Sequence, residues 1–219
     1  VVLLLFVSLN LVSFAQFAGP AGTVGSTAMH RDSSAFVNWA NNAQLQLGLI
    51  DIANPFSGSA SSGDANSPLN FPDGACVSLG DSGVAILTFP QEITNEPGPD
   101  FAVFENGFSD QFLELAFVEV SSDGINFTRF PAISNTQHDT QIGPFDAQGD
   151  ATLLYNLAGK YRANFGTPFD LEELAGTPGL NISAITHVKI IDVVGVINGN
   201  HIQYDSNGNP INDPYATAF

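Results

Sequence analysis

An apolar run at residues 112–120 constrains the fold of this chain more than any other feature. Leu113 and Phe117 stand at its odd positions, and Ala116 and Val118 stand at its even positions. Successive side chains of a strand point to opposite faces of the sheet. A strand with apolar side chains at both parities needs cover on both faces, so we predict that residues 112–120 form an interior strand.

The residues on either side of this run carry further strand and turn signals. Residues 101–104 form a second run of aromatic and β-branched type. After the central run, Ser122-Asp123-Gly124 supplies a residue that tolerates positive φ, and the alternating segment 125–129 follows. We expect a β-hairpin at this place.

The rest of the chain alternates short apolar runs with turns. Many short strands and little helix predict an all-β fold, and we expect residues 16–219 to form a single antiparallel, jelly-roll-like β-sandwich. The expected strands are residues 43–49, 75–79, 84–89, 152–157 and 185–197, with a short helix at 35–40, a capped helical turn at 171–174 and a long surface loop at 54–73.

Two groups of motifs carry a resemblance to known proteins. The hairpin Val118-Glu119-Val120-Ser121-Ser122-Asp123-Gly124-Ile125-Asn126-Phe127 resembles those of discoidin-like (galactose-binding-like) jelly rolls, a fold that many carbohydrate-binding modules use. A longer pattern is similar to a family of bacterial secreted cell-surface proteins, and it comprises residues 98–108 (GPDFAVFENGF), 116–120, 159–162 and 185–192. The resemblance implies a fold and a cell-surface location rather than an activity. In that family a further apolar strand follows the Asp-Pro-Tyr motif, so we expect the chain to be truncated after Phe219.

The charge and cysteine content exclude several functional classes. The formal net charge is −17, because 22 acidic residues face only 5 lysines and arginines. A chain of this charge repels phosphate backbones, so we predict no nucleic-acid partner. Cys76 is the only cysteine, which excludes an internal disulfide and a zinc-thiolate site.

The first residues predict export. Val1 to Ala15 is apolar and uncharged and ends in Ser13-Phe14-Ala15, as a secretory signal peptide with a small-x-small cleavage site does. A membrane anchor is the alternative, although the segment is short for a span. No initiator Met or basic segment precedes it, so we expect a signal peptide at residues 1–15 that is incomplete at its N-terminus. We predict a secreted or cell-surface location.

Oxygen-bearing side chains predict a calcium site near the C-terminus. Asp205, Asn207 and Asp213 surround a glycine at intervals that resemble a calcium loop, although the spacing differs from that of an EF-hand. The same residues can instead form a cluster of Asx turns without an ion. If calcium binds, the loop alone leaves its shell incomplete, and we predict Glu105 or Asp192 as remote ligands.

Asp192 interrupts an apolar strand, so its carboxyl group must be paired, coordinated or protonated. The alternative to a metal is a structural cation, for which Lys189, Lys160 and Arg162 are the candidates.

Three residues are candidates for binding a ligand. Asn106 follows a predicted strand and precedes Gly107, a position that suits either ligand binding or capping of the strand end. Trp39 and Tyr161 are candidate platforms for stacking on a sugar ring, with packing in the core as the alternative role.

Catalytic signals are weak. The histidines do not cluster, and no nucleophile elbow, phosphate-binding loop or dinucleotide fingerprint is present. We interpret Cys76 as a small core residue, and the pair Glu105 and Glu114 is the only carboxylate combination that we single out for glycoside hydrolysis. We predict no catalytic residues.

Three functions remain open. The first is an extracellular binding module, with carbohydrate as its ligand class and calcium holding a loop. A structural or adhesive surface domain without a small ligand is the second, and it would have its aromatic residues buried. The third is a secreted hydrolase, which requires a deep cleft with two carboxyl groups whose pKa values differ widely.

Overall fold

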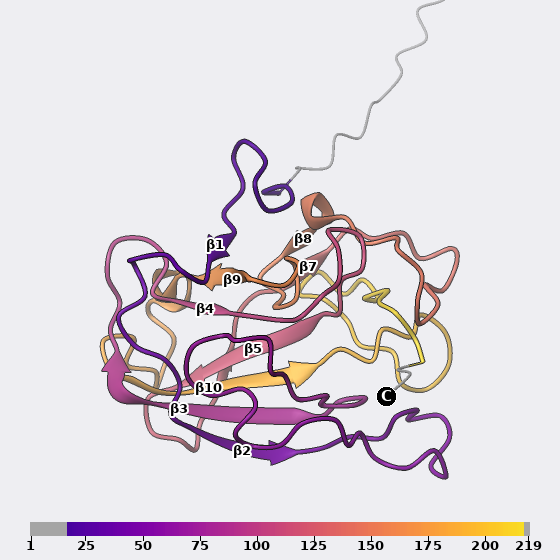
Figure 1. Cartoon of the computed structure of the whole chain (residues 1–219), viewed down its shortest axis with the longest axis horizontal. Coiled ribbons are helices and arrows are strands. Elements are labelled where there is room, and N and C mark those ends of the chain that lie inside the picture. Colours follow the sequence, from indigo (N-terminus) through magenta and orange to yellow (C-terminus); the bar gives the residue numbers. More distant parts are fainter. Residues whose placement is uncertain (1–16, 217–219) are drawn as a thin grey trace, which may run out of the picture.

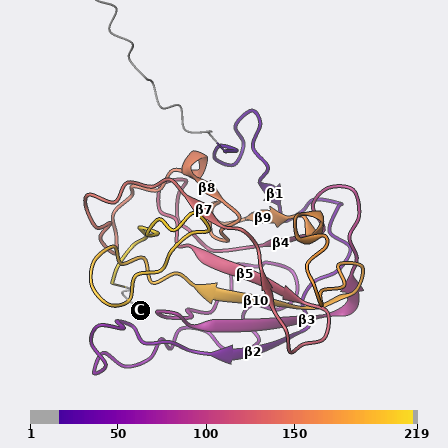
Figure 2. The same ribbon diagram turned by 180° about the vertical axis from the view of Figure 1, so that it is seen from behind.

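The protein is built from two stacked antiparallel sheets. The computed structural model describes residues 17–216. One sheet has three strands and the other has five. Figures 1 and 2 show from two opposite sides that the smaller sheet lies above the larger one. The strands are β1 (Met29–His30), β2 (Asn42–Gln46), β3 (Val84–Ile93), β4 (Phe101–Val103), β5 (Ala116–Ser121), β6 (Thr128–Arg129), β7 (Ile133–Ser134), β8 (Leu154–Tyr155), β9 (Phe165–Phe169) and β10 (Ile185–Asp192).

The strand order defines the two layers. The large sheet has the order β2-β3-β10-β5-β6 and the small sheet has the order β1-β9-β4, while β7 and β8 pair beside them. Every strand pair is antiparallel. The predicted all-β antiparallel sandwich is therefore confirmed, and its jelly-roll-like character stays a prediction.

Strand β5 is the predicted interior strand, and both of its faces are covered. Val118 and Val120 pack with Phe130 and Phe169 in the core between the two sheets. On the opposite face of β5, Phe117 packs in a second cluster of apolar side chains, which comprises Leu113, Leu115, Ala132, Leu154, Leu157, Val193 and Ile211. The apolar residues at both parities thus correspond to two separate cores.

The strand pairing begins later than the sequence predicts. Residues 112–115 are not part of β5, because the backbone N–H of Leu115 donates to the Asp213 carboxylate at 2.7 Å rather than to a neighbouring strand. The same segment passes very close to Gly159, where an added Cβ would lie 1.7 Å from the carbonyl oxygen of Glu114. Side-chain and loop contacts replace the sheet ladder here.

Two predicted elements are wrong. Residues 35–40 are not helical and run as an irregular segment after a turn, because Phe36 and Trp39 pack against Phe104 and Phe71 from distant segments. Residues 75–79 do not form a strand and run as an irregular segment.

Other predicted elements are present in modified form. The predicted strand at 152–157 is a short 3-10 turn, Ala151–Leu153, followed by β8. The capped turn at 171–174 is confirmed as a 3-10 turn, and its N-cap Asp170 accepts from the N–H of Glu172. The predicted hairpin forms between β5 and β6, with the exposed Asp123 accepting from the N–H groups of Ile125 and Asn126.

Within residues 17–216, no helix has the length and apolar character that a membrane crossing requires. The predicted signal peptide at residues 1–15 lies outside the described residues.

The burial of β5 leads to a first prediction. Val120→Asp places a carboxylate where the wild-type side chain is 0% exposed, which costs several kcal/mol and is comparable to the stability of a whole domain. We expect this variant to lose its cooperative thermal unfolding transition. Ile125→Asp makes a similar change at an 81% exposed hairpin position, so it should keep the wild-type melting temperature. Cooperative melting of Val120→Asp near the wild-type temperature would contradict the assignment of β5 as a buried strand.

Candidate functional site

A cleft opens between the two sheets because they differ in width. Neighbouring strands lie roughly 4.8 Å apart, so the three-stranded sheet is about 10 Å narrower than the five-stranded sheet. Strand β4 forms the edge of the small sheet, and loop residues rather than further strands cover the inner face of β3 beyond it. The resulting cleft has a volume of about 720 Å³, which is within the usual range for ligand pockets.

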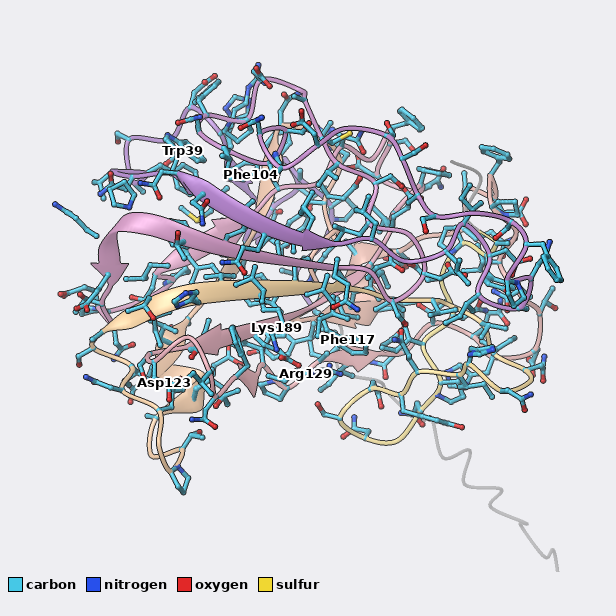
Figure 3. All side chains as sticks on the ribbon, turned by 90° about the horizontal axis from the view of Figure 1, so that it is seen from below. Trp39, Phe104, Phe117, Asp123, Arg129 and Lys189 are labelled. Carbon is cyan, nitrogen blue, oxygen red and sulfur yellow. The ribbon has the colours of Figure 1, made fainter. Side chains whose placement is uncertain are left out.

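Four aromatic side chains form one wall of this cleft. We call Phe36, Trp39, Phe71 and Phe104 the aromatic cluster, and all four line the cleft. The ring centroids are 5.0 Å apart for Phe36 and Trp39, 5.6 Å for Trp39 and Phe71, and 5.8 Å for Trp39 and Phe104. Figure 3 shows Trp39 and Phe104 side by side near the β2 edge of the large sheet.

The cluster joins segments that are far apart in the sequence. Phe36 and Trp39 come from the segment before β2, Phe71 comes from the long loop before β3, and Phe104 follows β4 directly. Trp39 is only partly buried, so an apolar aromatic surface remains open to the cleft. Such a surface suits the flat apolar face of a ligand.

Carboxyl groups from both sheets also line the cleft. Glu105 follows β4 in the small sheet, while Glu114 precedes β5 and Asp192 ends β10 in the large sheet. The Glu105 carboxylate accepts from the N–H of Gly107 at 2.6 Å, and that of Asp192 accepts from the N–H of Ser82 at 3.2 Å. We call these three side chains the carboxyl group cluster.

Burial makes these groups weak acids. It raises the pKa of Glu105 to about 8, and the nearby charge of Glu114 adds to this effect. Burial also raises the pKa of Glu114, and it raises the pKa of Asp192 well above its usual value, with the charge of Asp81 as a second cause. At neutral pH the protonated form of Glu105 therefore predominates.

The predicted cationic partners of Asp192 are engaged elsewhere. Lys189 donates to Glu119 at 2.8 Å on the outer face of the large sheet, where Arg129 also reaches Glu119 and where Figure 3 shows both basic side chains. Lys160 donates to the backbone oxygen of Leu154, and Arg162 donates to Asp110 and to the backbone oxygen of Ala21. The expectation of a lysine or arginine beside Asp192 is wrong.

The predicted calcium loop is held together by its own backbone. The buried Asp205 carboxylate accepts from the N–H groups of Ser134, Asn207 and Asn209, at 3.1, 2.9 and 2.8 Å. Asn207 is exposed, and the Asp213 carboxylate points elsewhere, to the N–H of Leu115. This geometry favours the Asx-turn alternative for the loop.

Asp213 instead interacts electrostatically with Glu105 and Asp192, the two residues that the sequence predicts as remote calcium ligands. Burial raises its pKa well above the usual value, and the charges of Asp192, Glu114 and Glu105 act in the same direction. Across residues 17–216, no three or more His, Cys, Asp or Glu side chains form a group arranged to hold a metal ion. Calcium binding stays a prediction.

The predicted ligand-binding residues separate into two environments. Asn106 and Trp39 both line the cleft, and the Asn106 amide donates to the Cys76 sulfur at 2.9 Å. Tyr161 is 1% exposed, and its hydroxyl is hydrogen-bonded to Thr27 at 2.8 Å, so its ring is not available to a ligand and the sequence interpretation of Tyr161 as a platform is wrong. Cys76 is half-buried at the cleft rather than a core residue, and burial raises the pKa of its thiol.

Local sequence patterns do not identify most of the aromatic cluster. They predict a helix at Phe36 and a strand at Phe104, and neither prediction marks a ligand-binding position. Phe71 had a usable signal, because it is an aromatic residue in a loop that is otherwise rich in Ser, Gly, Asn and Pro. An apolar ring in such a loop is exposed unless another segment covers it.

Comparisons with protein-family models, with curated proteins and with solved structures give no match. The interpretation of the cleft therefore rests on its own residues, and the resemblance to secreted cell-surface proteins stays a prediction.

The raised carboxyl pKa values predict an unusual dependence of stability on pH. A carboxyl group whose pKa is raised on folding binds more protons in the folded state, so stability falls as pH rises from the unfolded pKa, near 4, to the folded pKa, about 8 for Glu105. We expect a lower melting temperature at pH 8 than at pH 5. A loss of about 2 kcal/mol would lower it by roughly 4–8 °C in a chain of this size.

The variant Glu105→Gln tests the origin of this dependence. It removes the buried ionisation, so the melting temperature should vary less between pH 5 and pH 8 than in the wild type. Asp139→Asn makes the same change at an exposed position and should leave the slope unaltered. A wild-type melting temperature that does not fall over this range would show that the carboxyl groups are solvated.

Calcium binding by the 205–213 loop has its own test. An ion that binds only the folded state adds about 2.7 kcal/mol to the free energy of unfolding at a hundred times its Kd. The sequence thus predicts a higher melting temperature with excess calcium than with chelator. Asn207→Ala should abolish that increment, and it should leave the melting temperature in chelator unchanged because the exposed side chain is not needed by the Asx turns. Equal melting temperatures with calcium and chelator would leave only the Asx-turn description.

Proposed function

We propose that this chain is an extracellular or cell-surface binding module that holds a carbohydrate in the cleft between its two sheets. The observation that carries this proposal is the aromatic cluster, because four rings from distant segments line a concave site beside polar side chains. Rings of this kind pack against the apolar C–H faces of sugars. The export signal predicted at Val1 to Ala15 supports an extracellular ligand.

Polar groups beside the rings provide partners for sugar hydroxyls. The protonated Glu105 carboxyl group can both donate and accept, and the Asn106 amide has a carbonyl oxygen besides the NH₂ group that contacts Cys76. At the cleft lining, Asn38 donates to Gln91 at 3.3 Å, a long bond between exposed side chains that a hydroxyl group can replace. The site thus combines an apolar surface with neutral hydrogen-bonding groups.

The same observations weigh against the two alternatives. A purely structural or adhesive domain would bury its aromatic side chains, whereas Trp39 and Phe71 are only partly covered, Phe71 being 42% exposed. A glycoside hydrolase needs one ionised carboxylate beside a protonated acid. Burial disfavours the ionised form of Glu105, Glu114 and Asp192 alike, so the environment of none of the three favours the ionised partner that such an enzyme needs. Binding without catalysis fits this site best.

Two natural probes make the proposal easy to test. Trp39 is the only tryptophan and Cys76 is the only cysteine of the chain, and both line the cleft. On the mature protein, a glycan-array hit should change tryptophan fluorescence and should slow alkylation of Cys76 at alkaline pH. Trp39→Ala should weaken binding about 30-fold, which corresponds to about 2 kcal/mol for a central aromatic contact.

The matched control is Phe56→Ala. Phe56 is 97% exposed and lies outside the cleft, so loss of its ring should leave sugar affinity and Cys76 protection as in the wild type. Sugar binding of equal strength in Trp39→Ala, or the lack of any glycan hit, would refute the proposed cleft function.

A further inference from the structure

We propose that the cleft prefers sugars that carry a free amine over the same sugars in N-acetylated form. This inference rests on the proposed carbohydrate function, and it names the ligand class that the charge arrangement of the cleft selects.

In the part of the chain that the structure describes, the carboxyl group cluster lines the cleft without an ion-paired basic side chain that would balance its negative charge on ionisation. Glu105, Glu114 and Asp192 reach the cleft from both sheets. The charges of all three oppose ionisation of the buried Asp213. Each of the four carboxyl groups is disfavoured as an anion by burial. A cation brought by a ligand would favour the ionised form and remove the repulsion.

Among the described residues, no lysine or arginine forms an ion pair with any of these four carboxyl groups. Lys189 and Arg129 share Glu119 on the outer face of the large sheet, and Lys160 and Arg162 donate to other groups. Arg31 does line the cleft, but its guanidinium group lies 5.3 Å from the Phe71 ring centroid and donates to the Pro72 carbonyl oxygen at 2.6 Å. No histidine is among the residues that line the cleft.

An ammonium group suits the rest of the site as well. It has three hydrogen-bond donors and no acceptor, so it can satisfy several carboxylate oxygens at once. The aromatic cluster borders the same space, and the faces of aromatic rings attract cations. An anionic sugar gains no such contact, because it brings a further negative charge to carboxyl groups whose own ionisation is already disfavoured.

The test compares three trisaccharides of the same linkage, made of glucose, glucosamine or N-acetylglucosamine. Titration is followed by the fluorescence of Trp39 at a pH where the amine is charged. The glucosamine trimer should bind about tenfold or more tightly than the N-acetylated trimer, as expected for one added hydrogen bond between charged groups.

Two variants place the preference in the cleft. Glu114→Gln and Glu105→Gln each remove one carboxyl group while keeping its shape, so the ratio of the two Kd values should fall towards one. Each substitution removes repulsion between buried carboxyl groups, so we expect both variants to remain folded, and their melting curves will test this. Asp139→Asn makes the same charge change at an exposed site outside the cleft, and it should retain the wild-type ratio.

The outcomes separate this inference from the function on which it rests. Equal affinity for the glucosamine and N-acetylglucosamine trimers would overturn the amine preference and leave the carbohydrate cleft intact. A preference that persists in both glutamine variants would also overturn it, because the general negative charge of the chain would then be the cause. Failure of all three trimers and of the glycan array to bind would refute both proposals.

Discussion

The difference in width between the two sheets is the constraint on which the rest of the structure depends. Two sheets of equal width bury their inner faces against each other, but here β3 extends beyond the cover that β4 provides. An apolar sheet face cannot be left to water, so the long segments before β2 and before β3 lie over it. Loops cover such a face less completely than strands do, since their side chains do not interdigitate at regular intervals. The cleft is the consequence.

The sequence predicted the parts of the fold that depend on local patterns. The apolar residues at both parities around Phe117 and Val118 identified β5 as an interior strand, and the Asp123-Gly124 turn identified the next hairpin. Residues 35–40 show where such patterns fail. Their helical spacing of apolar residues was overridden by tertiary contacts of Phe36 and Trp39 with aromatic rings more than thirty residues away.

The candidate site was less predictable for the same reason. The sequence marks Trp39, Asn106 and Glu105 individually as candidates, and nothing in their local sequence shows that they line one cleft. Their association depends on how β4 and the loop before β2 are placed over the large sheet, which is a long-range property. Tyr161 shows the opposite case, a residue that suits a site by type but does not belong to one. Its aromatic ring and hydroxyl suit a sugar platform, yet the side chain is buried and its hydroxyl is hydrogen-bonded to Thr27.

A comparison of two aspartates distinguishes structural carboxylates from those available to a ligand. Asp205 is buried, but three backbone N–H groups donate to its carboxylate. These hydrogen bonds offset the free-energy cost of desolvating the carboxylate, so its role is to stabilise the turn. Asp192 accepts from one backbone N–H, that of Ser82, and the charges of Asp81 and Glu114 oppose its ionisation. A fold has no structural need for a carboxyl group held in this way, because an apolar residue would fill the strand end without repulsion. Conflicts of this kind with the rules of a stable core are concentrated at functional sites. Asp192 lies at the cleft with Glu105 and Glu114, and burial disfavours the ionised form of all three, which fits the proposed ligand-binding role of the cleft better than a role in the fold.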